Sequence, residues 1–478
     1  MSVDTSDEAF RARFAQLISD LLNETRRDDE PISVAIQAHL GSDGAQLQIH
    51  GEELPSFELA NLQLGLDAAL ARPGYSHTVL GVAGQGRRFS EVSLTDLLRS
   101  SHHRVGPPEY VSAPAGPSRT LPCLTWSVVL ITAPDGPVCL FIRRGEEFGP
   151  VHGIVVQAIS AKPETAVRFL ADLRRLMDEH DVFRGQVISI SADNRGSLRV
   201  HFLERPELDE GDLILPDGLL ERIERHALGP TNHRDALLAR NRHLSRGLLL
   251  WGPPGTGKTH TVRYLTGRLR GSTVIILSGA SLGAIGRIGG IARRLAPAVV
   301  VLEDVDLIAQ ERTFGPQRSQ PALFELMNEM SGLAEDADVA FILTTNRPDA
   351  LEPALAARPG RVDLAIEIPL PDATARRRLL ELYARGLDLE PSLGEIADRT
   401  AGATASFFRE LLRKATLASI EAGHERVTES ELTNALDELL AETAALTRVL
   451  LGHADGGKPE AGTPHAWMER MAQTPSAE

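Results

Sequence analysis

Between residues 246 and 372, short and wholly apolar runs alternate with segments whose apolar positions recur at helical spacing. A strand buried on both faces reads as a continuous apolar run, and a helix between two such strands lets them pair in parallel. Four runs have this character: GLLLW, TVIIL, AVVVL and VAFILTT. The pattern predicts a domain of α/β class, with a parallel sheet, over residues 246–372.

Helical periodicity continues without strand-like runs after residue 372. The segments concerned are ATARRRLLELYARGL, LGEIADRT, SFFRELLRKATLASIEAG and ESELTNALDELLAETAALTRVLL. They predict an all-helical domain over residues 373–451. Residues 452–478 are rich in glycine, proline and alanine and show no period, so we expect a disordered tail there.

The first 105 residues mix strand-like and helical patterns. Residues 6–23 have apolar positions at helical spacing, and so does the segment FELANLQLGLDAALA. The segments ISVAIQAHL and AQLQIHG alternate instead, which predicts two strands paired around the turn GSDG. We therefore expect an N-terminal α+β module over residues 1–105.

A second α+β module is predicted over residues 118–205. The stretch 106–122 is rich in proline, glycine and serine and is expected to be a linker. After it, TWSVVLITAPDGPVCLFIRRG predicts a hairpin, KPETAVRFLADLRRLMDEHDVF an amphipathic helix, and GQVISISADNRGSLRVHFLE a further hairpin. No catalytic motif is recognisable in these first two modules, and residues 206–245 are expected to connect them to the α/β domain.

Composition excludes several classes of protein. The net charge of −15 argues against general nucleic-acid binding, which needs a basic face. No apolar run approaches the roughly 18 residues of a membrane span, and the start of the chain lacks a signal-peptide pattern. Cys123 and Cys139 are too few for a disulfide framework and are expected to be core thiols. We therefore expect a cytoplasmic protein without a membrane partner.

The string GPPGTGKT has the context of a phosphate-binding loop, since it follows GLLLW and precedes the helical segment HTVRYL. Glycines let several backbone N–H groups converge on one phosphate, and the helix N-terminus adds a partial positive charge. Lys258, one of only four lysines, is predicted to bind the β- and γ-phosphates of ATP, and the Thr259 hydroxyl to bind Mg²⁺. The predicted nucleotide-binding residues of this loop are Gly252, Pro253, Pro254, Gly255, Thr256, Gly257, Lys258, Thr259 and His260.

The run VVVLEDVDLI delivers three acids, Glu303, Asp304 and Asp306, at the end of a predicted buried strand. Its carboxyl end is expected to lie beside Thr259, so Glu303 is predicted to support Mg²⁺ and Asp304 to activate the attacking water. An aspartate is one methylene shorter than the glutamate usual at the second place, a displacement of about 1 Å that can affect catalysis. Acids at a helix start would be the alternative interpretation, but it leaves the preceding apolar strand without an explanation.

Together these motifs resemble the AAA+ ATPases, and specifically their AAA subgroup. The resemblance rests on GPPGTGKT, on VVVLEDVDLI, on ILTTNRPDALEPALAARPGRVDLAIEIPLPD and on the helical block behind them, and it covers about residues 212–447. It implies a phosphate-loop parallel sheet with a helical lid, Mg²⁺-dependent ATP hydrolysis, and a ring of identical chains, usually six. The order Glu-Asp is shared with the Bcs-type translocases of this subgroup, which are active.

The resemblance also assigns residues outside the loop and the acids. Asn346 matches the polar residue that orients the attacking water. Arg358 and Arg361 match the arginine fingers that reach the γ-phosphate of a neighbouring subunit. A plainer interpretation of these arginines is that they pair with Asp363 or Glu367 on the surface.

Lid and pore positions complete the comparison with the family. Ala405 and Ser406 match small residues that pack on the adenine, and no arginine stands there. The region that forms the family's pore loop has no aromatic residue, which leaves Ile285, Ile288 and, in a second loop, Phe314 as candidates for gripping a polypeptide. The sequence has no His-Glu-x-x-His motif, so a fused zinc protease is excluded.

These observations favour an ATP-hydrolysing ring that assembles, disassembles or remodels a protein client chosen by the N-terminal region. The alternative is a scaffold that binds ATP and assembles but turns over little. A DNA-dependent ATPase is a third interpretation, against which the acidic net charge argues.

Overall fold

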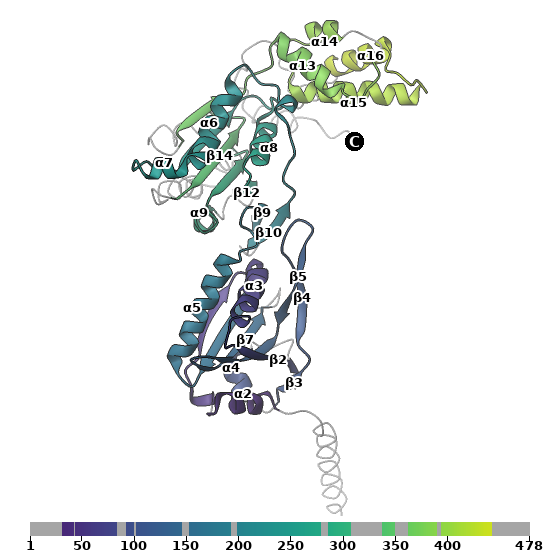
Figure 1. Cartoon of the computed structure of the whole chain (residues 1–478). Coiled ribbons are helices and arrows are strands. Elements are labelled where there is room, and N and C mark those ends of the chain that lie inside the picture. Colours follow the sequence, from purple (N-terminus) through teal and green to yellow (C-terminus); the bar gives the residue numbers. More distant parts are fainter. Residues whose placement is uncertain are drawn as a thin grey trace, which may run out of the picture. The chain divides into compact units, whose positions relative to one another are not determined.

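The chain divides into two compact units, residues 1–204 and 205–478. The computed structural model describes most of both units (Figure 1): residues 31–42, 44–83, 92–99, 102–145, 153–192, 198–278, 285–306, 337–348, 362–389 and 393–441. No helix in these ranges has both the length and the apolar character needed to cross a membrane.

An antiparallel sheet of six strands forms the centre of the first unit, as far as its described residues show. The strand order is β1-β8-β7-β6-β2-β3. These strands are β1 (His50–Leu54), β2 (Ser76–Ala83), β3 (Arg104–Gly106), β6 (Ser127–Ala133), β7 (Gly136–Arg144) and β8 (Ile154–Ser160). The strands β6, β7 and β8 are buried along most of their length because helices cover both faces of the sheet.

The two faces of this sheet have separate cores, and β7 divides them. Its residues Val138, Leu140 and Ile142 pack with one pair of helices, whereas Cys139 and Phe141 pack with the other pair. The first pair is α3 (Leu59–Leu70) and α5 (Pro163–Glu179), and the second is α2 (Ile32–Leu40) and α4 (Leu94–Arg99). The expectation that Cys123 and Cys139 are core thiols is confirmed, since both are buried and unpaired with each other.

The division of this region into two modules, 1–105 and 118–205, is wrong. Strand β2 pairs with β6 from Ser76 opposite Thr132 onward, and β1 pairs with β8, so both predicted modules contribute to one sheet. Local sequence patterns carry no signal for pairings between strands about 50 residues or more apart. The proline- and glycine-rich junction suggested a boundary between two modules, but strands from both sides of it pair in one sheet.

That junction is also not a linker. Residues 106–122 contribute to a hairpin of two strands, β4 (Glu109–Pro114) and β5 (Thr120–Thr125), which pair from Glu109 opposite Thr125 to Pro114 opposite Thr120. Prolines occupy strand ends and edges in this hairpin, where a missing N–H costs little.

The prediction of a strand for ISVAIQAHL is wrong as well, because this segment forms α2. Its buried residues are Ile32, Ile36 and Leu40, spaced four apart, whereas Val34 is 45 % exposed. The apolar positions fit both periods in the sequence, and burial on one helical face decides between them. The helix ends at Gly41, which adopts the left-handed conformation with φ of 68°.

Other predictions for the first unit are confirmed. Helices α3 and α5 and the hairpin of β6 and β7 form where the patterns placed them, and so does a last hairpin, β9 (Val187–Ala192) with β10 (Leu198–Leu203). Aromatic contacts fix this hairpin within the unit: Phe202 stacks on Phe183 at 5.3 Å between ring centroids, and Phe183 meets Phe57 edge-on at 5.9 Å.

The second unit is built on parallel strands, as predicted, and its α/β class is confirmed. Its described strands lie in the order β12-β13-β14-β11-β15. They are β11 (Arg246–Trp251), β12 (Thr273–Ser278), β13 (Ala298–Glu303), β14 (Val339–Thr345) and β15 (Leu364–Glu367). Since all five point the same way, their carboxyl ends meet at one edge of the sheet.

The predicted connector, 206–245, is part of this domain. It contains α6 (Leu219–Asn232) and α7 (Arg234–Leu238). Arg246 binds it to the sheet by donating hydrogen bonds to Ala227 O at 3.0 and 2.8 Å and to Thr231 Oγ1 at 2.6 Å. The same guanidinium pairs with Asp338 at 2.9 Å, and both side chains are almost fully buried.

The four described helices of the C-terminal block enclose a core of their own, so the all-helical prediction is confirmed over residues 373–440. These helices are α13 (Ala373–Tyr383), α14 (Leu393–Arg399), α15 (Ala405–Glu421) and α16 (Glu429–Leu440). Fully buried Phe407, Phe408 and Leu411 lie at its centre. The predicted helix 6–23 and tail 452–478 lie outside the described residues.

Because the pair of Arg246 and Asp338 is buried, Asp338→Ala leaves an uncompensated cation in the interior. We expect the free energy of unfolding to fall by about 3–5 kcal/mol, measured as a lower urea midpoint of the full-length protein. Asp388→Ala is the matched control, since Asp388 pairs with Arg426 at 2.8 Å on the exposed surface and is expected to contribute less than about 1 kcal/mol. Equal shifts for the two variants would contradict this account.

Candidate functional site

The phosphate loop begins where β11 ends, and two close approaches require its glycines. Gly252 has a φ of 149°, and a Cβ there would lie 2.2 Å from Ile368 O. Gly255 has a φ of 76°, and a Cβ there would lie 2.0 Å from Ser406 Oγ. A Cβ at Gly252 would clash with backbone that cannot easily move, and both residues have a positive φ that strains other residue types, so the geometry favours glycine at these two positions.

Lys258 lies inside the curve of this loop. It begins α8 (Lys258–Arg268), and its Nζ donates to Gly252 O at 2.9 Å and to Pro253 O at 2.8 Å. Burial lowers the pKa of Lys258 to about 8, although Asp304 and Asp306 act in the opposite direction. The amine is therefore mostly charged at neutral pH and is held at the place where a phosphate would meet it.

Glu303 and Thr259, the two predicted Mg²⁺ ligands, lie in contact. Glu303 ends β13, and its carboxylate accepts a hydrogen bond from the Thr259 hydroxyl on α8. Burial raises the pKa of Glu303, while Thr259 lowers it and the neighbouring Asp304 raises it further. A hydroxyl and a carboxylate at one place are the oxygen ligands that Mg²⁺ prefers, so these residues fit the ion.

Asp304 leaves the strand in the left-handed conformation, with a φ of 50°. Its N–H donates to Thr344 Oγ1 at 3.0 Å, and its carboxylate accepts from Asn346 Nδ2 at 3.4 Å. Aspartate tolerates this conformation better than most residues. The turn gives the two consecutive acids different partners. Glu303 contacts Thr259 of α8, and Asp304 contacts Asn346, which follows β14.

Asp306 belongs to the same site, although sequence reasoning gave it no role. It is 5 % exposed, and its Oδ1 accepts hydrogen bonds from Thr345 Oγ1 at 2.9 Å and from Asn346 N at 3.2 Å. It therefore fixes the backbone that carries Asn346. The sequence around Asp306 carries no local signal for this role, because it depends on Thr345 and Asn346, about 40 residues away.

The lid meets the phosphate loop through the start of α15. Ser406 N and Ser406 Oγ both lie within hydrogen-bonding range of Gly255 O, at 3.3 and 3.5 Å, and Thr404 Oγ1 lies 3.1 Å from Ser406 Oγ. The predicted lid residues Ala405 and Ser406 are thus brought to the loop from 150 residues away. The start of the lid helix α15 is therefore in direct contact with the phosphate loop.

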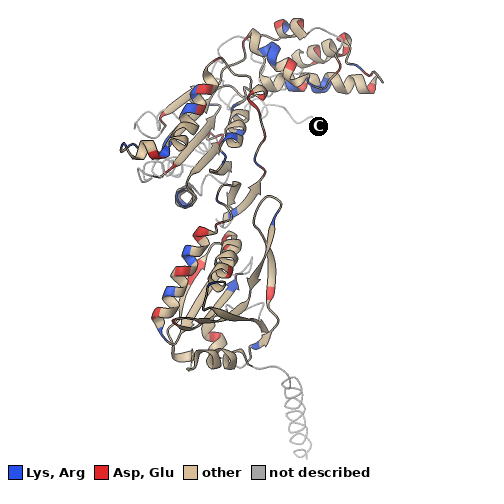
Figure 2. Cartoon of the chain, viewed as in Figure 1, with Lys and Arg blue, Asp and Glu red and all other residues tan. Residues whose placement is uncertain are grey.

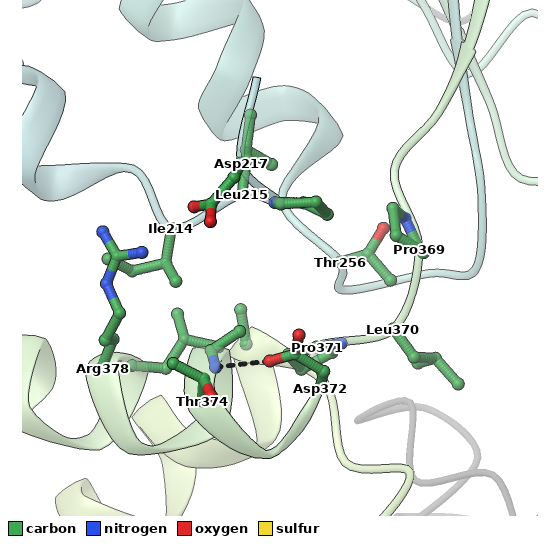
Figure 3. Close-up of a pocket in the computed structure, with 14 residues that line it drawn as sticks. Ile214, Leu215, Asp217, Thr256, Pro369, Leu370, Pro371, Asp372, Thr374 and Arg378 are labelled. Atoms are coloured by element: carbon green, nitrogen blue, oxygen red, sulfur yellow. Dashed lines mark hydrogen bonds between the residues drawn. The ribbon is translucent and has the colours of Figure 1, made fainter. Parts of the chain in front are cut away.

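A cavity of about 310 Å³ opens beside the loop, within the size range of small-molecule sites. Figure 3 shows Asp217 on one side and Thr374 on the other, with Thr256 of the phosphate loop at one end. Its walls also include Ala405 and several apolar side chains: Ile214, Leu215, Pro216, Pro369, Leu370, Pro371 and Leu379. Apolar walls next to a phosphate-binding loop suit the base of a nucleotide.

The remaining predicted residues have different outcomes. His260 directs its Nε2 at Asp212 O, 3.1 Å away, so this ring holds a backbone segment. Ile288 lies in α9 (Ile285–Arg294) and is 1 % exposed, so the idea that it grips a polypeptide is wrong. Arg358, Arg361 and Phe314 lie outside the described residues, and so does the side chain of Ile285.

Known proteins with similar sequences also carry an ATPase domain of this kind. The family model described as "ATPase family associated with various cellular activities (AAA)" matches residues 248–370, which include the phosphate loop, the acids and Asn346. The proteasome-activating nucleotidase of Thermococcus onnurineus is 30 % identical over 271 residues, covering 54 % of this chain and 67 % of that protein. The one of Pyrococcus horikoshii is 31 % identical over 274 residues, with the same coverage.

Similarity extends to larger proteins. The ATP-dependent zinc metalloprotease FtsH 2 of Symbiobacterium thermophilum is 34 % identical over 239 residues, which are 47 % of this chain and 40 % of that protein. The chain thus spans less than half the length of this relative. The matched segments, the order of the parallel strands and the contacts around the phosphate loop agree, and the chain belongs to the AAA family of ATPases.

Proposed function

We propose that the chain binds ATP with Mg²⁺ and hydrolyses it, in a ring of identical subunits, to remodel a protein client. The observation that carries this proposal is the meeting of four side chains at the carboxyl edge of the sheet. Thr259 contacts Glu303, and Asn346 contacts Asp304, so the two acids already have separate partners. A site that only bound nucleotide would not need the second pair.

Nucleotide binding follows from the loop. Backbone N–H groups and the charged Lys258 amine would hold the phosphates, and Thr259 with Glu303 would hold Mg²⁺. Bound Mg²⁺ would neutralise charge on the β- and γ-phosphates. Phosphate charge near Lys258 would also favour its protonated form, offsetting the effect of burial on its pKa.

Hydrolysis needs a base and a means of orienting water. The Asp304 carboxylate would accept a proton from the water as its oxygen bonds to the γ-phosphorus, and the bond to the β-phosphate oxygen breaks. The Asn346 amide, which donates to Asp304, would fix that water, and Asp306 accepts from the backbone N–H of Asn346. The left-handed turn at Asp304 would direct its shorter side chain toward the water, where a longer glutamate would reach it from an extended strand.

A protein client is supported by the printed names of the relatives. One name joins ATP to a protease and the other joins a nucleotidase to activation of the proteasome, so both connect nucleotide use with work on proteins. The N-terminal unit has its own sheet and its own cores, as a separate domain for client selection would need. Arginine fingers Arg358 and Arg361, a ring of six and a cytoplasmic location belong to this proposal.

Charge distribution supports a protein partner over DNA. Figure 2 shows basic and acidic residues interspersed along α5 and the lid helices. On the lid, Arg377 pairs with Asp398 at 3.0 Å and Arg399 pairs with Asp437 at 2.7 Å. Arginines already paired with carboxylates on their own surface are poorly placed to neutralise phosphates.

Asp304→Asn is expected to lower ATP turnover at least 100-fold with little change in ATP affinity, because the amide cannot accept a proton while the loop is intact. Lys258→Ala is the matched variant and is expected to lose binding. Steady-state phosphate release and fluorescence titration with an ATP analogue measure the two effects. A parent protein that binds ATP and forms rings without turnover would favour the scaffold alternative.

Asp306→Ala tests the positioning of Asn346. Without its carboxylate, the Thr345 hydroxyl and the Asn346 N–H lose their acceptor, and misplacement by about 1 Å can lower the rate about 100-fold. We expect kcat to fall 10- to 100-fold with the Kd for ATP unchanged. A weaker Kd with an unchanged kcat would show that Asp306 acts on the loop instead.

A shared site predicts complementation between two inactive variants. Subunits carrying Lys258→Ala cannot bind ATP, and those carrying Arg361→Ala cannot complete the neighbour's site. Mixed rings still contain some intact pairs, so partial recovery of ATPase activity is expected. Absence of recovery, with mixing verified by differently tagged subunits, would contradict a site between subunits.

A further inference from the structure

One wall of the cavity beside the phosphate loop is held from two directions. The segment 211–217 provides this wall through Ile214, Leu215 and Asp217. From α8, His260 Nε2 donates to Asp212 O at 3.1 Å. From the lid, Arg385 donates to the Asp212 carboxylate at 2.9 Å and to Gly211 O at 3.2 Å.

Arg385 is positioned to bring opposite walls of the cavity together. It follows α13 directly, and α13 supplies the facing wall with Thr374, Arg378 and Leu379. Ile214, on the wall held by Arg385, packs at the same time against the core of the lid. The two contacts of Arg385 with residues 211 and 212, together with the packing of Ile214, therefore hold the two walls at their observed separation.

His260 gives this arrangement a fixed reference on the nucleotide side. It follows Lys258 and Thr259 on the first turn of α8, so the Asp212 backbone is anchored to the same helix that carries the phosphate-binding residues. The Asp212 carboxylate also accepts from Asp209 N at 3.1 Å, which keeps its other oxygen directed at Arg385. Contacts from α8, from the lid and from its own turn thus converge on Asp212.

We propose that Arg385, Asp212 and His260 form a clamp that sets how tightly the cavity closes on the base of the bound nucleotide. The proposal rests on the proposed function, since it takes the cavity as the site of the base. The three residues are positioning residues and need not touch the nucleotide. The phosphates are held by Lys258 and the loop, so the clamp acts on affinity for the base alone.

Arg385→Ala in the full-length protein provides the test. We expect the Kd for both ATP and ADP to rise about three- to tenfold, as suits a partly exposed charged contact. Binding of inorganic tripolyphosphate, which has no base, should not change in competition with a fluorescent ATP analogue. Arg385→Lys should recover part of the affinity, and combining Arg385→Ala with Asp212→Ala should add little to either single effect.

Arg399→Ala is the matched control, because it removes another partly exposed lid ion pair, with Asp437, neither of whose residues lines the cavity. If Arg385→Ala changes the Kd for ATP no more than this control does, the clamp is overturned and nucleotide binding stands. Equal losses for ATP and tripolyphosphate would also overturn it, since the effect would then reach the phosphates. A parent protein that fails to bind ATP at all would instead overturn the proposed function.

Discussion

The left-handed turn at Asp304 is the constraint on which the site depends. Consecutive residues of an extended strand point to opposite faces of the sheet, so the backbone conformation after Glu303 decides where the second acid is directed. The φ of 50° at Asp304 ends the strand after Glu303 and redirects the second acid. The N–H of Asp304 is held by Thr344 and its carboxylate by Asn346, so β14 stabilises the turn. Glu303 would then be free to bind Mg²⁺ while Asp304 activates the water.

Much of this site could be predicted from the sequence because its motifs are local. The phosphate loop is a continuous string whose glycines, lysine and threonine have fixed relations to the strand before it and the helix after it. The role of Asp306 was missed because it depends on the end of β14, 39 residues away. The clamp was missed for the same reason, since Asp212 and Arg385 are separated by 173 residues and neither belongs to a motif.

In the fold, too, features set by nearby residues were predicted and features set by distant residues were missed. Parallel strands and lid helices were predicted correctly because each is long or strongly periodic. The helix α2 was mistaken for a strand because its apolar residues fit both periods, and only the exposure of Val34 separates them. The single sheet of the first unit was missed because its pairings, such as Ser76 with Thr132, join segments on either side of a region that contains breakers of regular structure.

A structure of the protein bound to MgADP and beryllium fluoride, a mimic of ATP before hydrolysis, tests the assignment of the two acids most directly. We predict that Glu303 and Thr259 will lie on the Mg²⁺ side. The Asp304 carboxylate and the Asn346 amide should lie within hydrogen-bonding distance of a water in line with the fluoride group. A complex in which Asp304 lies on the metal side and Glu303 faces the water would contradict this account.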